Sequence, residues 1–181
     1  MLASLGLAVD IVVSTYDEQP LAGLTPRDLA LTHARGKARG AESAQLIVAA
    51  DTVVDLDGEA LGKPRDRAEA RTMIGRLAGR THLVHTAFSL RDPRTGRSLD
   101  GLETTAVRFA ALDSAVLDAY ADSGDGLDKA GAYGIQGFAA TLVERIDGDY
   151  FTVVGFPLAR FAQALGELGY RLLPRPVEAL A

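Results

Sequence analysis

The feature that most constrains the fold of this chain is an unbroken apolar run, Leu-Ile-Val-Ala-Ala at residues 46–50, which ends directly in Asp51 and Thr52. An apolar run without polar alternation is typical of a strand that is buried on both faces of a sheet. Helices must then cover both faces of that sheet. Because ligands of α/β proteins gather at strand ends, the carboxylate and the hydroxyl that follow the run are candidates for a functional site.

Helix start and stop signals recur between the strand-like runs. Thr25 followed by Pro26 has the pattern of an N-cap and a proline in the first helical position, and Asp66 with Glu69 has the spacing of a capping box. These signals, together with apolar stripes at helical spacing, predict helices over residues 25–39, 66–77, 113–121 and 157–168.

Alternating and β-branched runs predict strands over residues 10–14, 46–50, 52–56, 83–90, 104–109 and 139–146. Asp57-Gly58 and the stretch Asp-Pro-Arg-Thr-Gly at 92–96 have the residues that hairpin turns require. Because helices and strands interleave without a strict βαβ rhythm, we expect an α/β fold in which helices flank a mixed, twisted sheet.

The length and composition indicate one domain over residues 1–181, with a frayed tail at 174–181. The absence of cysteine excludes disulfides, thiolate metal sites and a cysteine nucleophile. A net charge of −5, without a basic run interleaved with aromatics, argues against nucleic acid as a partner. Residues 1–9 are apolar but lack a basic region, and Asp10 ends them short of signal-peptide or membrane-spanning length. We therefore expect a cytoplasmic protein that does not bind membranes.

Lysine is rare in this chain. Of the 19 basic residues 16 are arginines, and the others are Lys37, Lys63 and Lys129. An ammonium is compact and flexible whereas a guanidinium is a planar fork, so the two are not interchangeable in a tight anionic site. A codon bias toward arginine explains the count as well. The neighbouring Asp51, Asp128 and Gln136 favour the functional explanation.

Two of the lysines have simple structural alternatives. Gly62 and Pro64 flank Lys63 and favour an extended backbone that aims the ammonium at one point, unless Lys63 is only a solvated loop residue. Lys37 lies with Arg35 at the end of the first predicted helix, where basic residues also complement the helix dipole.

A glycine-rich stretch at residues 126–137 contains Lys129 and Gln136 and holds four glycines. Glycines let backbone N–H groups approach a ligand, and a glutamine carboxamide offers a donor and an acceptor that can read the polar edge of a nucleobase. A tight turn between a helix and a strand would require some of these glycines as well.

Asp51 and Thr52 also leave several explanations open. An aspartate in this position can bind a divalent cation or act as a general base toward water, and the adjacent threonine can hydrogen-bond a ligand. The aspartate can equally open a turn into the next strand. The residues alone do not decide between these explanations.

Four motifs in order resemble those of the Maf family of nucleoside triphosphate pyrophosphatases, over residues 1–168. They are Ala50-Asp51-Thr52, Leu61-Gly62-Lys63-Pro64-Arg65-Asp66, the stretch 127–137 and Val153-Val154-Gly155-Phe156-Pro157-Leu158. The resemblance implies an α/β fold related to the inosine triphosphatase group, a homodimer and a requirement for Mg²⁺ or Mn²⁺. It also implies hydrolysis of a nucleoside triphosphate to the monophosphate and pyrophosphate.

Two of the motifs resemble the branch that acts on dTTP and UTP, which implies a role for each candidate residue. Asp51 would be the proton acceptor and a ligand of the metal, while Thr52 and Gln136 would set the base specificity. The three lysines would neutralise the triphosphate of the bound nucleotide.

The chain departs from the family pattern at three places. Family members begin with a strand and a Ser-x-x-Arg-Arg loop that grips the triphosphate, whereas residues 1–6 align with the end of the helix that follows this loop. We therefore expect an N-terminally truncated domain. Gly36 replaces a usual glutamate, and Thr152 replaces a usual asparagine. Two functions follow, an active pyrophosphatase or a catalytically impaired nucleotide-binding or regulatory protein.

Overall fold

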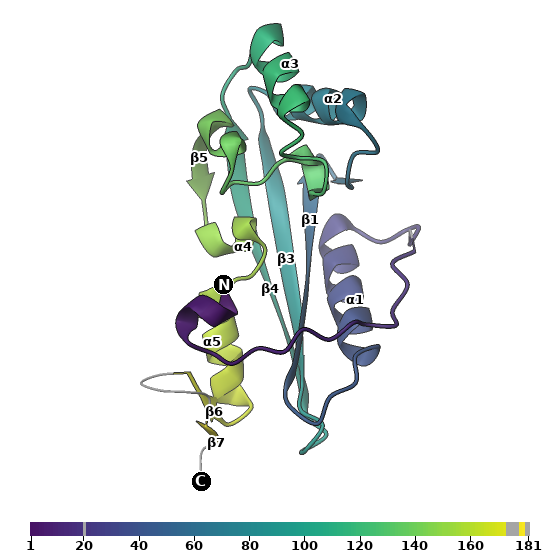
Figure 1. Cartoon of the computed structure of the whole chain (residues 1–181), viewed down its shortest axis with the longest axis vertical. Helices are drawn as coiled ribbons and strands as arrows, with labels where there is room; N and C mark the ends of the chain where they lie inside the picture. The colour runs from purple at the N-terminus through teal and green to yellow at the C-terminus, as the bar shows by residue number, and fades with distance from the viewer. Residues whose placement is uncertain (20, 173–177, 180–181) are drawn as a thin grey trace.

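The centre of the fold is a five-stranded sheet with the strand order β2-β1-β3-β4-β5, in which every pairing is antiparallel. The computed structural model describes residues 1–19, 21–172 and 178–179. The strands of this sheet are β1 (Ile47–Leu56), β2 (Glu59–Leu61), β3 (Thr81–Arg91), β4 (Ser98–Phe109) and β5 (Val143–Asp147). Figure 1 shows that the long strands β1, β3 and β4 run along the centre of the molecule. The α/β class and the helix-flanked sheet are confirmed. The sheet is antiparallel throughout its described strands and not mixed, because tight hairpin turns connect β1 with β2 and β3 with β4.

Helices form where the capping signals predict them. They are α1 (Pro26–Arg39), α2 (Arg67–Leu77), α3 (Ser114–Ser123), α4 (Tyr150–Val154) and α5 (Leu158–Glu167), with short 3₁₀ turns at Leu2–Leu5, Ala130–Ala132 and Phe138–Leu142. The side chain of Thr25 accepts a hydrogen bond from the Asp28 amide, and that of Asp66 accepts one from the Glu69 amide. The capping box is not reciprocal, because the Glu69 carboxylate accepts from the Arg65 amide instead of the Asp66 amide. The helix α4 was not expected.

Both predicted hairpin turns are confirmed. Asp57 and Gly58 take the left-handed φ values of 56° and 87° that a two-residue turn between β1 and β2 requires. In the turn between β3 and β4 the carboxylate of Asp92 accepts hydrogen bonds from the Arg94 amide, the Thr95 hydroxyl and the Tyr170 hydroxyl. This buried carboxylate ties the turn to the strand β6 (Tyr170–Arg171), which pairs with β7 (Glu178–Ala179).

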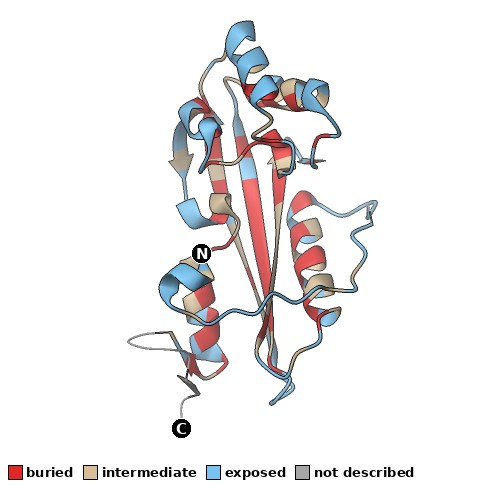
Figure 2. Ribbon diagram, viewed as in Figure 1, coloured by how far each residue is buried: buried red, intermediate tan, exposed pale blue. Residues whose placement is uncertain are grey.

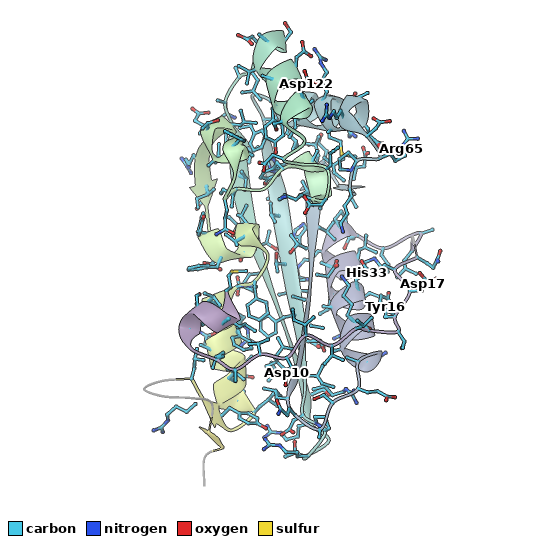
Figure 3. All side chains as sticks on the ribbon, in the orientation of Figure 1. Asp10, Tyr16, Asp17, His33, Arg65 and Asp122 are labelled. Carbon is cyan, nitrogen blue, oxygen red and sulfur yellow. The ribbon has the colours of Figure 1, made fainter. Side chains whose placement is uncertain are left out.

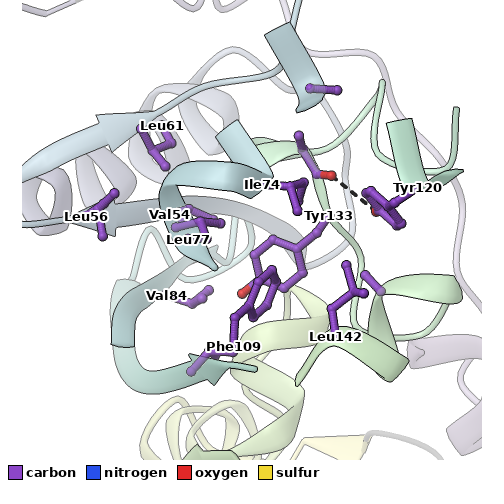
Figure 4. Packing of buried hydrophobic residues seen from close by; sticks show 14 residues of the cluster. Val54, Leu56, Leu61, Ile74, Leu77, Val84, Phe109, Tyr120, Tyr133 and Leu142 are labelled. Atoms are coloured by element: carbon purple, nitrogen blue, oxygen red, sulfur yellow. Dashed lines mark hydrogen bonds between the residues drawn. The ribbon is translucent and has the colours of Figure 1, made fainter. Parts of the chain in front are cut away.

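The sheet separates two layers of apolar side chains. On one face Ala30 and Ala34 of α1 pack on Val53 and Ala87. The neighbouring Val54 points to the other face, where α2, α3 and the glycine-rich stretch cover a larger cluster. Figure 2 shows the buried residues concentrated along β1, β3 and the inner faces of the helices, and Figure 4 shows the larger cluster in detail. The described helices include none that is long and apolar enough to cross a bilayer.

Four predicted strands differ from the structure. Residues 10–14 form no strand, and Ile11 and Val13 are 96% and 87% exposed, because no neighbouring strand pairs with them in the described chain. Residues 46–50 and 52–56 belong to the single strand β1, whose register with β3 runs unbroken from Ile47 opposite Arg91 to Asp55 opposite Leu83. The predicted strand at 139–146 begins with a 3₁₀ turn and becomes a strand only at Val143.

Two consequences of the β1 geometry bear on the site. Asp51 lies in the middle of the strand, so the predictions of a strand end and of a turn at this residue are both wrong. Val48 to Thr52 are only partly buried, so the expected burial of both faces is wrong as well. Most of the predicted frayed tail, residues 174–177 and 180–181, lies outside the described residues.

Candidate active site

All six predicted site residues line one cavity of about 1020 Å³: Lys37, Asp51, Thr52, Lys63, Lys129 and Gln136. The cavity lies where β2 ends, because β2 pairs only with the last part of β1, from Val54 to Leu56. In the described chain no strand lies beside residues 47–53 on that edge of the sheet. Asp51 and Thr52 point to opposite faces of β1, and this free edge lets both reach the same cavity.

Asp51 is paired with the ammonium of Lys37 on α1. The Nζ atom of Lys37 lies 2.7 Å from Oδ1 of Asp51 and 3.0 Å from Oε1 of Glu18, so one cation joins two carboxylates. Burial raises the pKa of Asp51 above its ordinary value, although the hydrogen bond from Lys37 opposes that shift. Burial by itself would lower the pKa of Lys37, but the bonds to Asp51 and Glu18 outweigh it and hold this pKa above its ordinary value. A raised carboxylate pKa suits a general base.

Glu18 belongs to the site, although the sequence did not assign it a role. Its contact with Lys37 depends on the path of the segment before α1, which hydrogen bonds tie to that helix. The Ser14 hydroxyl donates to the carbonyl of Lys37 (2.9 Å), and the Thr15 amide donates to the carbonyl of Gly40 (2.9 Å). The adjacent acidic pair at 17–18 was the only sequence signal for this residue.

Gly36, which replaces the glutamate usual in the family, has a structural reason in this chain. A Cβ atom at this position would lie 2.3 Å from the ring of Tyr16, so the ring occupies the space of the missing side chain. The hydroxyl of Tyr16 lies 2.9 Å from Nδ1 of His33, which also lines the cavity. Figure 3 shows Tyr16 and His33 together where the N-terminal segment crosses α1. Tyr16 therefore holds the segment that carries Glu18 against the helix.

Lys63 and Lys129 also line the cavity, from the connection between β2 and α2 and from the glycine-rich stretch. Lys63 lies between β2 and α2, next to Gly62, whose carbonyl accepts a hydrogen bond from the Gly131 amide (3.0 Å). The Nζ atom of Lys129 donates to the carbonyl of Asp125 (2.9 Å), and its aliphatic stem packs on Gly134. Lys129 therefore stabilises the loop as well as lining the cavity.

The glycines of this stretch serve partly to close the loop. A Cβ atom at Gly126 would lie 1.8 Å from the carbonyl oxygen of Ala132, and Gly131 has a left-handed φ of 66°. The structural explanation of these two glycines therefore holds. Gln136 is exposed on the cavity wall and makes no hydrogen bond with another described side chain, so its carboxamide is free to contact a ligand.

Thr52 is held by a hydrogen bond to the neighbouring strand β3. Its Oγ1 atom lies 2.9 Å from Oγ1 of Thr86 on β3, and the Thr86 hydroxyl donates to the carbonyl of Thr152 on α4 (2.7 Å). Thr152 is fully buried, and its own hydroxyl and amide donate to the carboxylate of Asp149, the N-cap of α4. The expected asparagine is therefore replaced by a residue whose carbonyl is connected to the site.

The donor set fits a hard cation that is shared with phosphate. The described residues contain no cluster of three or more His, Cys, Asp or Glu side chains that could enclose a metal. Asp51 and Glu18 nevertheless place two carboxylates around one Lys37 ammonium. Mg²⁺ is usually held by one or two carboxylates together with water and substrate phosphates, so a third protein ligand is not required.

Comparison with known proteins identifies the family of this chain. The sequence matches the family described as Maf-like protein over residues 1–168. The chain belongs to the Maf-like protein family. Among curated relatives named dTTP/UTP pyrophosphatase, one from Thermus thermophilus is 44% identical over 171 residues, covering 94% of this chain and 89% of the relative. A second, from Anaeromyxobacter dehalogenans, is 47% identical over 174 residues, covering 95% of this chain and 89% of the relative.

The family assignment agrees with the positions of the four motifs in this Maf-like protein. Asp51 and Thr52 lie on β1, Lys63 follows β2, and Gln136 lies near the end of the glycine-rich stretch, so three of the motifs meet at one cavity. The fourth motif contributes Val153, Val154 and Gly155 to the same wall. Motifs that are separated by up to about a hundred residues therefore form one site.

Proposed function

We propose that this Maf-like protein hydrolyses dTTP and UTP between the α and β phosphates, releasing the nucleoside monophosphate and pyrophosphate. The observation that carries the proposal is the Glu18–Lys37–Asp51 cluster in the same cavity as Thr52 and Gln136. The cluster supplies the groups for phosphoanhydride hydrolysis, and the two polar side chains supply groups for base selection. The printed names of the relatives support the same substrates.

In the proposed reaction Asp51 accepts the proton of the attacking water, because burial raises its pKa although the hydrogen bond from Lys37 opposes the shift. Lys37, Lys63 and Lys129 stabilise the negative charge of the triphosphate and of the departing pyrophosphate. Asp51 and Glu18 would hold Mg²⁺ or Mn²⁺ together with phosphate oxygens, and the cation would supply further neutralisation of the developing charge.

Base selection would depend on hydrogen bonds to the pyrimidine edge. Thymine and uracil present an acceptor–donor–acceptor pattern, and the carboxamide of Gln136 can donate its N–H to a carbonyl oxygen of this edge. A site built for such pairing discriminates strongly, since a wrong base leaves its polar groups without partners. We therefore expect dTTP and UTP to be preferred over dCTP, ATP and GTP.

The alternative function is nucleotide binding without efficient turnover. It is suggested by the cavity lining, which contains lysines but no arginine in the described chain. The two functions differ in turnover, so the test is pyrophosphate release from dTTP, UTP, dCTP, ATP and GTP with Mg²⁺ or Mn²⁺. Binding of dTTP without release of pyrophosphate would favour the alternative.

The substitution Asp51→Asn tests the catalytic role. An amide is nearly isosteric but cannot accept the proton, so we expect pyrophosphate release to fall below detection while the thermal midpoint stays close to that of the parent. Asp122→Asn on the exposed side of α3 is a matched control that should leave turnover unchanged. Retained turnover in the Asp51 variant would remove this residue from the chemistry.

We also propose that the protein acts as a homodimer in the cytoplasm. Three aromatic side chains are exposed in the described chain, Phe138 at 70% and Tyr150 and Phe151 at 39% each, and such residues are enriched at protein interfaces. Size-exclusion chromatography with light scattering tests the oligomeric state. A monomer at micromolar concentration would contradict this part of the proposal.

A further inference from the structure

A chain of two hydroxyls and a carbonyl connects the cavity with the interior. Thr52 Oγ1 lies 2.9 Å from Thr86 Oγ1, and Thr86 Oγ1 lies 2.7 Å from the carbonyl oxygen of Thr152. Thr86 is fully buried on β3, so solvent does not compete for its hydroxyl. Thr52 lies on the cavity wall and is only partly buried.

The carbonyl at the inner end determines the direction of both hydrogen bonds. A hydroxyl has one hydrogen to donate, whereas a carbonyl can only accept. Thr86 therefore uses its hydrogen on the carbonyl of Thr152, and the bond between the two threonines must be donated by Thr52. If Thr86 donated to Thr52 instead, Thr86 Oγ1 and the carbonyl oxygen of Thr152 would face each other at 2.7 Å inside the protein without a hydrogen between them.

Thr52 consequently presents only lone pairs to the cavity. Its hydroxyl hydrogen points inward, so a ligand that approaches Oγ1 must supply a hydrogen. The approach is open on one side because Gly155, which also lines the cavity, has no side chain, and a Cβ atom there would lie 3.4 Å from Oγ1 of Thr52.

We propose that Thr86 is a positioning residue for base specificity, which makes Thr52 an obligatory acceptor for the ring N–H of a nucleobase. Thymine and uracil carry a hydrogen on N3 and can donate to Thr52. Cytosine has a lone pair on N3 and meets the lone pairs of Thr52 instead. The inference rests on the proposed function and adds to it the atom that separates dTTP and UTP from dCTP.

Thr52 can distinguish only those bases that differ in the ring N–H at their pairing edge. Adenine, like cytosine, lacks a ring N–H at its pairing edge, whereas guanine has one at N1. Thr52 therefore disfavours dCTP and ATP by hydrogen bonding, and the rejection of GTP depends on other parts of the cavity. The effect of Thr86 should consequently be seen in the ratio of dTTP to dCTP and not in the ratio of dTTP to GTP.

The test is the substitution Thr86→Val, which keeps the shape of the side chain and removes its hydroxyl. Thr52 is then free to turn its hydrogen toward the cavity and donate to N3 of cytosine. We expect the ratio of kcat/KM for dTTP to that for dCTP to fall by about tenfold, the effect of about one hydrogen bond. Thr86→Ser keeps the hydroxyl and should retain the parent ratio.

Thr105→Val is a matched control. Thr105 is also fully buried, lies on the neighbouring strand β4, and donates its hydroxyl to the carbonyl of Asp149 (2.9 Å), but it does not line the cavity. This variant should lose comparable stability while keeping the parent ratio. Thermal midpoints of all variants separate lost stability from changed specificity.

The outcomes distinguish this inference from the proposed function. If the parent hydrolyses dTTP and Thr86→Val keeps the parent ratio, the inference is wrong and the proposed function stands. If Thr86→Val and Thr105→Val lower the ratio equally, Thr86 has only a structural role. If the parent hydrolyses no nucleoside triphosphate, the proposed function fails first. Should Thr86→Val not fold, Thr86→Ala removes the same hydroxyl, and an unchanged ratio in that variant would equally overturn the inference.

Discussion

His82 should make the folded protein sensitive to mild acid. It lies on β3 with only 2% of its surface exposed, and its Nε2 atom is 2.7 Å from the hydroxyl of Tyr133 in the glycine-rich stretch. The rings of Phe109 and Tyr133 pack edge-on against it. Burial lowers the pKa of His82 from 6.5 to about 4. Nδ1 has no partner in the described chain, so a proton there would also lack an acceptor.

The sign and size of the effect follow from linkage. Above pH 6.5 His82 is neutral in both states, so it adds no pH dependence. Below pH 6.5 the unfolded state binds a proton that the folded state does not bind until about pH 4, so stability falls as the pH falls through this window. A difference of about 2.5 pKa units at about 1.36 kcal/mol each gives a loss of roughly 3 kcal/mol by pH 4, of which about 2 kcal/mol is lost by pH 5.

The assay is urea unfolding at pH 7.5, 6.0 and 5.0, with His82→Gln compared with the parent protein. Glutamine can still hydrogen-bond the Tyr133 hydroxyl but does not titrate, so its free energy of unfolding should fall less steeply with acid. All other titrating groups are shared and cancel in the difference between the two proteins. Parallel pH dependences of the parent and the variant would refute the reasoning, as would an NMR titration of His82 with a midpoint near 6.5.

Three further predictions concern the site. Lys63→Arg should lower kcat/KM for dTTP by about tenfold although the charge is preserved, because a planar guanidinium cannot replace the compact ammonium at the triphosphate. A variant with the kcat/KM of the parent would show that Lys63 is only a surface residue. Gln136→Ala should flatten the preference for dTTP and UTP in a competition assay, and an unchanged profile would remove this side chain from base selection. Gly36→Ala should displace Tyr16, and with it Glu18, and lower kcat/KM for dTTP by about tenfold. The helical control Gly166→Ala, where a Cβ atom meets nothing within 4 Å, should keep full activity. Equal activities of the two variants would show that the contact of Tyr16 with Gly36 is dispensable.

Much of the secondary structure could be predicted from the sequence because its signals are local. The N-caps Thr25, Asp66 and Asp113 each accept a backbone amide three residues ahead, and Asp57-Gly58 adopts the left-handed turn that these residue types favour. Such interactions depend only on neighbours in the chain. The scarcity of lysine and the family motifs together identified six residues that line one cavity.

The strand predictions failed where the outcome depends on a partner. Residues 10–14 have the pattern of a strand, but in the described chain no other strand pairs with them. Asp51 follows an apolar run as a strand end would, yet pairing with Ala87 continues β1 through it. A β-strand is stabilised by hydrogen bonds to another strand, so its ends are not encoded in its own residues alone.

Local signals in the sequence were sufficient for α1, α2, α3 and α5, for the two hairpin turns and for the residue types available for phosphate, metal and base. Which of these residues act together depends on tertiary packing. It brought Glu18 to Lys37 and Asp51, filled the space above Gly36 with Tyr16, and placed Thr86 behind Thr52. These contacts join residues that lie 14 to 34 positions apart in the sequence. Local propensity does not predict which of these distant residues come into contact, because the packing of the helices and the register of the strands determine those contacts.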